Sequence, residues 1–191
     1  MKSLQKKLLS KVTTAALVVA AAGTAQAAGG MKLGSPAFSD HDMLPAKYAA
    51  KGGPRNCDGE GVSPPLEWSN TPEGTNSYAI IVHDSAGAHG LWVTHWLDCE
   101  IPGTSSSFRE GEVSGAPAGG NYVDGTNRIG KPVWFGPCPD VGNRPQHYVF
   151  TLIATDLEPD ALESGLDKAG LLAALEGHAL GATSLVGRYA R

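Results

Sequence analysis

Residues 133–156 read VWFGPCPDVGNRPQHYVFTLIATD, a rigid loop that runs directly into an apolar segment. The first part, 133–147, holds three prolines, two glycines and one cysteine. Proline removes backbone donors and clashes with a preceding helical turn, so this part is neither a helix nor a central strand. The second part, 147–156, is rich in β-branched and aromatic residues, as strands are. The sequence therefore predicts a stiff loop aimed at the end of a strand.

Two further apolar runs have the same composition, SYAIIVHD at 77–84 and LWVTHWLDCEIP at 91–102. Turn signals such as TPEGTN (71–76) separate the runs, and the chain holds 25 glycines and 13 prolines. Short strands between frequent turns predict an all-β sandwich or barrel. The runs do not alternate cleanly between apolar and polar residues, so we expect these strands to be buried on both faces.

One late segment follows a different period. Within residues 162–178, the leucines at 171, 172 and 175 have helical spacing and Gly177 is a plausible stop. The sequence therefore predicts a helix near the C-terminus that packs on the sheets. Residues 103–124 are rich in glycine and serine and are expected to form a long loop.

The first 27 residues have the features of a secretory signal peptide. Four lysines (2, 6, 7 and 11) precede the apolar run at 13–25, and Ala25-Gln26-Ala27 resembles a cleavage site. A membrane anchor is the alternative, but the apolar run is shorter than the ~20 residues that a span needs. We predict cleavage after Ala27, which gives one domain, residues 28–191, in the periplasm or secreted.

The charge balance limits the partners. Residues 1–27 hold four lysines and no acidic residue, so their removal changes the net charge from −4 to −8. An acidic protein is poorly suited to nucleic acid or to an anionic membrane surface. We expect no nucleic-acid partner, no stable membrane anchor and no cofactor. A small anion could still bind locally, and a protein partner is left open.

Three cysteines follow the signal segment, at positions 57, 99 and 138. In an oxidising compartment, one disulfide and one remaining thiol are favoured. Cys57 and Cys138 lie in loops rich in glycine and proline, which suits a disulfide, whereas Cys99 ends an apolar run. The alternative is three reduced, packed thiols.

The histidines at 83, 89 and 95, beside Asp84, could in principle bind a metal. Their six-residue spacing is wider than that of the usual zinc pairs, so we expect no metal site. The chain also lacks a Gly-x-Ser-x-Gly nucleophile motif and a glycine-rich phosphate loop that opens a helix. These patterns give no catalytic residue.

A small pocket at the strand ends is the better candidate. Asp84 ends one apolar run and Tyr148 opens another. His95 lies inside a third run and, by period-two counting, shares a side with Val93 and Leu97. A histidine in such a place is more often a hydrogen-bonded core residue, but these neighbours suggest a pocket with an acid, an imidazole, a phenol and rigid loop amides.

Several short motifs resemble those of the phosphatidylethanolamine-binding protein family, in particular its bacterial Raf-kinase-inhibitor-like branch. They occur in the family's order: SPPLEW (63–68), HD (83–84), WVTHW (92–96), EIP (100–102), GTNRIGKP (125–132), GPCP (136–139) and HYVFTLIA (147–154). The C-terminal EGHALGATSLVGRYAR is also similar, so the resemblance covers roughly residues 31–191. It implies an antiparallel β-sandwich with one or two peripheral helices and a small anion pocket.

The resemblance also implies which residues form that pocket. By position they are Asp84, His95, Gly136, Pro137, Cys138, Pro139, Gln146 and Tyr148. The GPCP loop would form one wall, and its prolines would pre-organise that wall at a low entropic cost.

Two positions depart from the family pattern. Ala86 stands where the family has a second acid, and Gln146 stands where it has a second pocket histidine. Gln146 and Tyr148 share a strand face, so His147 is expected to point away from the pocket. We therefore expect weaker anion binding or a different ligand.

Three functions remain open at this stage. The first is a periplasmic, non-enzymatic binding or regulatory protein for a phosphate-like anion or a phospholipid head group. The second is an enzyme with His95 as general acid or base and Asp84 as its orienting group. The third is an inhibitor of a partner protein. Asp84 favours the charged form of the His95 imidazole and burial disfavours it, and the sequence leaves open which effect is larger. If the two residues are close, His95 can be cationic below its pKa and supply the positive charge of the pocket.

Overall fold

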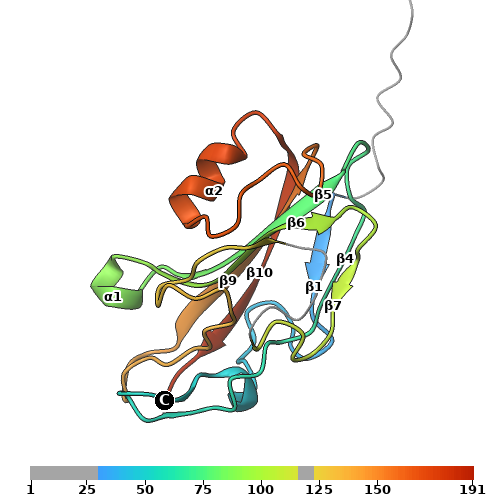
Figure 1. The fold of residues 1–191 in the computed structure, drawn as a ribbon. Coiled ribbons are helices and arrows are strands. Elements are labelled where there is room, and N and C mark those ends of the chain that lie inside the picture. The colour runs from blue at the N-terminus through green and yellow to red at the C-terminus, as the bar shows by residue number, and fades with distance from the viewer. Residues whose placement is uncertain (1–29, 116–122) are drawn as a thin grey trace, which may run out of the picture.

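The computed structural model describes residues 30–115 and 123–191 (Figure 1). The predicted signal peptide, residues 1–27, lies outside the described residues. The largest sheet has the strand order β10-β9-β5-β6-β8, and its neighbouring strands are all antiparallel. Its strands are β5 (Ser77–Asp84), β6 (Val93–Pro102), β8 (Val123–Asp124), β9 (Gln146–Thr155) and β10 (Ala179–Tyr189).

Two smaller sheets and three short helical segments complete the described part. A three-stranded sheet has the order β1 (Lys32–Gly34), β4 (Leu66–Ser69), β7 (Ser107–Phe108). A hairpin pairs β2 (Lys51–Gly52) with β3 (Cys57–Asp58). The helical segments are η1 (Ala46–Tyr48), α1 (Gly87–Gly90) and α2 (Lys168–Ala174). The predicted all-β, antiparallel class is confirmed. No helix in the described ranges is long and apolar enough to cross a membrane.

The large sheet is buried on both faces, as its unbroken apolar runs predict. One face packs on the three-stranded sheet, where Trp68 of β4 contacts the ring of Tyr78 from β5. The other face is covered by α2 and the residue that follows it, where Leu171 of the helix and Leu175 after it pack with Leu97 of β6. Burial of each such side chain contributes roughly 1.5–3 kcal/mol. Figure 1 shows α2 on one side of the long strands and β1, β4 and β7 on the other.

The predicted C-terminal helix exists but is shorter than the leucine spacing suggests. It begins after Asp167, whose carboxylate accepts a hydrogen bond from the Gly170 amide at 2.8 Å, and it ends at Ala174. The predicted loop at 103–124 is wrong near its two ends, because β7 and β8 lie within it. Both strands have only two residues, too few to leave a periodic signal.

Strand β10 is the long element that the apolar runs do not reveal. It pairs with β9 over ten positions, from Ala179 opposite Thr155 to Tyr189 opposite Gln146. Small residues and two glycines weaken its strand signal. A Cβ at Gly187 would lie 2.5 Å from Leu44 Cδ2, so a larger residue there would require the Leu44 side chain to move.

The proline-rich loop is held against the rest of the chain by backbone contacts. The Ala50 amide donates to the Pro137 carbonyl at 2.9 Å, and the Trp134 indole donates to the Tyr48 carbonyl at 3.0 Å. Gly136 permits this approach, since a Cβ there would lie 2.5 Å from both Tyr48 O and Ala50 N. These contacts are with backbone atoms, which cannot turn aside as a flexible side chain can.

We therefore predict that Gly136→Ala destabilises the protein by about 1–3 kcal/mol, because the loop must move away from residues 48–50. Gly34→Ala is the matched control: a Cβ at Gly34 meets no atom within 4 Å, and a change within about 0.5 kcal/mol is expected. Urea unfolding of both variants measures the difference. Equal stability of the two variants would contradict this packing argument.

Candidate functional site

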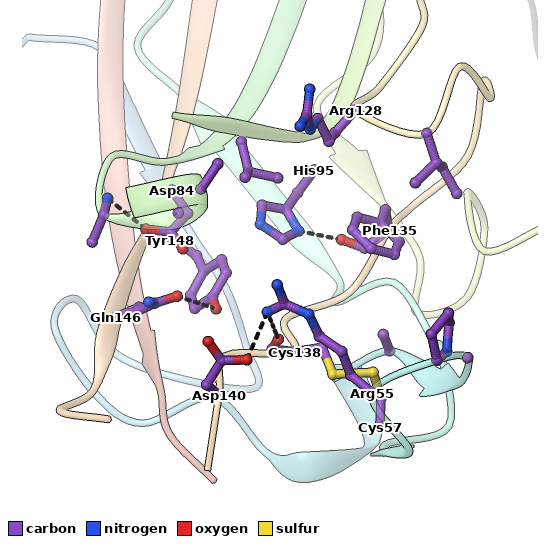
Figure 2. A pocket seen from close by; sticks show the side chains of 18 of the residues that line it. Arg55, Cys57, Asp84, His95, Arg128, Phe135, Cys138, Asp140, Gln146 and Tyr148 are labelled. Carbon is purple, nitrogen blue, oxygen red and sulfur yellow. Dashed lines mark hydrogen bonds and ion pairs between the residues drawn. A yellow bond between two sulfur atoms is a disulfide. The ribbon is translucent and has the colours of Figure 1, made fainter. Parts of the chain in front are cut away.

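A cavity of about 410 Å³ opens at the end of the large sheet where β5 stops and β9 begins. Its walls come from four segments, within residues 50–57, 84–95, 128–129 and 135–148. Figure 2 shows Asp84, His95 and Tyr148 projecting from the strands, while Arg55 reaches into the same space from the disulfide side. Strand ends and loops thus build the cavity together.

The structure gathers most of the sequence-predicted pocket residues around this cavity. Asp84, His95, Cys138, Gln146 and Tyr148 all line it. The other three predicted residues, Gly136, Pro137 and Pro139, are not among its lining residues. They belong to the loop behind the wall, where Gly136 and Pro137 fix the close contact with residues 48–50 described above.

His95 reaches the cavity because β6 carries an extra residue at that point. Thr94 lies opposite His83, but Trp96 lies opposite Val82, so His95 has no partner of its own on β5. Such a β-bulge re-aims the side chain. The prediction that His95 shares a side with Leu97 is therefore wrong. Leu97 packs under α2, whereas the His95 ring meets Tyr148 edge-on at 5.0 Å on the cavity side.

The imidazole of His95 is held by the loop and not by an acid. Its Nδ1 lies 2.5 Å from the Phe135 carbonyl oxygen, and the two rings stack at 5.5 Å. A carbonyl can only accept, so Nδ1 carries the hydrogen. Burial lowers the pKa of His95 to about 4, although the carbonyls of Phe135 and Gly136 oppose this shift. His95 is therefore neutral at neutral pH: of the two opposing effects that the sequence left open, burial and not the charge of Asp84 decides its protonation state.

Asp84 is a second buried acceptor in the cavity. The residue is 2% exposed, and its Oδ1 accepts a hydrogen bond from the Ala86 amide at 2.9 Å. Burial raises the pKa of Asp84, while the amides of Ala86 and Gly87 counteract that rise. Among the described residues, Asp84 forms no ion pair with His95.

At the start of β9, side chains alternate between the two faces of the strand as predicted. Gln146 and Tyr148 both line the cavity, and the Tyr148 hydroxyl donates a long hydrogen bond to Gln146 Oε1 at 3.5 Å. Burial and the nearby Asp84 raise the pKa of Tyr148, so its phenol keeps its proton. His147 is exposed and is not among the lining residues. The expectation that it points away is confirmed.

The disulfide between Cys57 and Cys138 is formed, as predicted, and Cys99 is a buried thiol. The disulfide joins the β2–β3 hairpin to the proline-rich loop, and Arg55 lies within that hairpin. The Arg55 guanidinium contacts Asp140 Oδ1 at 3.1 Å and the Cys138 carbonyl at 3.4 Å. The covalent tie therefore keeps a permanent cation at the edge of the cavity (Figure 2).

The sequence motifs did not identify the cations of the site. Three cations (Lys51, Arg55 and Arg128) and two carboxylates (Asp84 and Asp140) line the cavity, so its net charge is +1 with the histidines neutral. Arg128 lies in the GTNRIGKP motif and Arg55 lies two residues before Cys57. To predict that the segments of Arg55 and Arg128 meet at the cavity, both the disulfide and the strand topology must be known.

The alternative of a histidine metal site finds no support in the geometry. His83 stacks on Trp92 with ring centroids 4.8 Å apart, whereas His95 stacks on Phe135. Within residues 30–115 and 123–191, no three His, Cys, Asp or Glu side chains gather as metal ligands would.

The depressed pKa of His95 predicts a specific acid sensitivity. The unfolded chain takes up a proton at His95 as the pH falls from 6.5 towards 4, and the folded protein resists it. The stability linked to His95 is thus complete above pH 6.5 and is lost on the way to pH 4. This loss is on the order of 3 kcal/mol.

His95→Gln should lack this pH-dependent contribution. As the pH falls from 6.5 towards 4, the unfolding free energy of the wild type should therefore decrease more steeply than that of the variant. The exposed His147→Gln variant is the control and should parallel the wild type. Urea unfolding across this pH range measures both. A constant difference between the wild type and His95→Gln would contradict the prediction.

Comparison with known proteins places the whole arrangement in a family. Residues 34–190 match the family described as phosphatidylethanolamine-binding protein. A UPF0098 protein of Methanothermobacter thermautotrophicus is 37% identical over 161 residues, which cover 84% of this chain and 99% of that protein. LppC of Mycobacterium tuberculosis, named as a putative lipoprotein, is 35% identical over 91% of this chain and 79% of its own length.

Solved structures agree with the sequence relatives. The crystal structure of E. coli YbcL, described as a member of the mammalian PEBP family, superimposes with a TM-score of 0.76. It is 26% identical, and the match covers 85% of this chain and 99% of YbcL. The family match spans the two packed sheets and the cavity at their end. The chain therefore belongs to the phosphatidylethanolamine-binding protein family.

Proposed function

We propose that this protein binds a small phosphate-like anion in the cavity at the ends of β5 and β9, and that it does so after export to the periplasm. The observation that carries the proposal is a cavity of net charge +1 in a chain of net charge −4. Local positive charge in an acidic protein is typical of a site for an anion.

The donors of the cavity suit an oxyanion. Arg55 offers a planar guanidinium, whose fork of N–H groups fits phosphate oxygens. The Nε2 amide of Gln146 adds a neutral donor from β9, while its Oε1 accepts the hydrogen bond of the Tyr148 phenol. Because Arg55 is tied through the disulfide and Asp140, little conformational freedom is lost when an anion arrives.

Export is supported by the basic and apolar pattern of residues 1–27 and by the relative that is named as a lipoprotein. A binding or regulatory role agrees better with the cavity than catalysis does. An acid–base pair of His95 and Asp84 would need the carboxylate to orient the ring. In this chain the Phe135 carbonyl orients it instead.

Arg55→Gln should weaken binding of inorganic phosphate at least ~10-fold, since a charge-assisted hydrogen bond contributes about 1.5–3 kcal/mol. Arg109→Gln is the matched control: Arg109 is exposed, pairs with Glu112 and does not line the cavity. Isothermal titration calorimetry of the mature protein measures both variants. Equal affinity of Arg55→Gln and Arg109→Gln would contradict the placement of the site, and absence of any phosphate binding by the wild type would contradict the function.

A further inference from the structure

The neutral His95 presents a hydrogen-bond acceptor to the cavity. Its Nδ1–H is committed to the Phe135 carbonyl, so in the neutral ring Nε2 has a lone pair and no hydrogen. The residue lines the cavity although it is only 4% exposed. A ligand atom that meets Nε2 must therefore bring its own hydrogen, or a proton must be taken up.

The charged and titratable surroundings of His95 do not remove this requirement. They are Asp84 and His83 from β5, Tyr148 from β9, His89 from α1, Lys51 and Arg55 from the β2–β3 hairpin, Arg128 from the loop after β8, and Asp140 from the proline-rich loop. Asp84 is another acceptor in this set. A fully deprotonated oxyanion would thus face two buried acceptors, and each unmatched contact is costly.

We propose that the cavity selects the singly protonated form of phosphate or of a phosphate monoester, whose P–OH group donates a hydrogen bond to His95 Nε2. This inference rests on the proposed anion-binding function and specifies the form of the ligand. One negative charge also matches the net charge of +1 on the cavity walls. When the free ligand is a dianion, binding takes up one proton from the buffer, and that proton lies between the ligand oxygen and Nε2.

The test uses two tetrahedral oxyanions, inorganic phosphate and inorganic sulfate. Sulfate carries no proton between about pH 5 and pH 8.5, whereas phosphate loses its second proton within that range. Calorimetry in buffers of different ionisation enthalpy counts the protons that are taken up. We expect uptake of about one proton per phosphate near pH 8.5, little uptake near pH 5.5, and sulfate binding at least ~10-fold weaker than phosphate near pH 5.5.

Three variants identify the group that meets the proton. His95→Gln replaces the bare acceptor with an amide that can donate, so proton uptake and the preference for phosphate over sulfate should both disappear. Asp84→Asn removes the buried acid of the cavity, and loss of the uptake in that variant would assign the proton to Asp84. His147→Gln, at an exposed histidine that does not line the cavity, is the control and should keep the uptake. The side-chain oxygen that Asp84→Asn retains can still accept the hydrogen bond of the Ala86 amide.

Phosphate binding by the wild type without proton uptake near pH 8.5, or equal binding of sulfate, would overturn this inference and leave the anion site standing. Uptake that survives in His95→Gln but disappears in Asp84→Asn would also overturn it. If neither anion binds at any pH, both this inference and the proposed function fail. The wild-type comparison of phosphate with sulfate needs no variant, so it decides the matter even if His95→Gln does not fold.

Discussion

Two hydrogen bonds between His95 and Phe135 fix the cavity, because they join the bulge of β6 to the proline-rich loop. The Phe135 amide donates to the His95 carbonyl at 2.9 Å, and the His95 ring donates to the Phe135 carbonyl. The first bond continues the strand pairing for one step beyond the sheet. The second orients the imidazole and sets its tautomer. Together they place the loop, and therefore Cys138 and the disulfide, at a defined distance from the strand ends.

The charge distribution of the site follows from this constraint. Burial keeps His95 neutral because its effect is larger than that of the Phe135 and Gly136 carbonyls, and Asp84 is satisfied by local amides instead of by the imidazole. The strands thus supply acceptors and neutral donors, whereas the cations come from loops. Arg55 and Arg128 approach from two sides of the cavity mouth, where longer side chains can remain hydrated until a ligand arrives.

The sequence predicted the parts of the fold that depend on composition. The runs that became β5, β6 and β9 are dense in large apolar residues because both faces of the sheet are buried. Strand β10 escaped notice because its small residues and glycines resemble a loop, although its pairing with β9 is extensive. The family resemblance provided the sandwich and five of the residues that line the cavity. The alternation of side chains along a strand placed Gln146, His147 and Tyr148 correctly, because β9 is regular at that end. The same rule failed at His95, because one inserted residue in β6 turns the following side chains to the opposite face. Arg55 was beyond reach because its position depends on a disulfide between cysteines 81 residues apart.

The protonation state of His95 in the free protein tests the account most directly. Nitrogen-15 NMR of the imidazole, assigned by its absence from His95→Gln, reports each ring nitrogen separately. We predict that near pH 7 Nδ1 is protonated and Nε2 is not, since the Phe135 carbonyl requires the first hydrogen and burial excludes the second. A ring protonated on both nitrogens near that pH, or on Nε2 alone, would contradict the structure of the site as described.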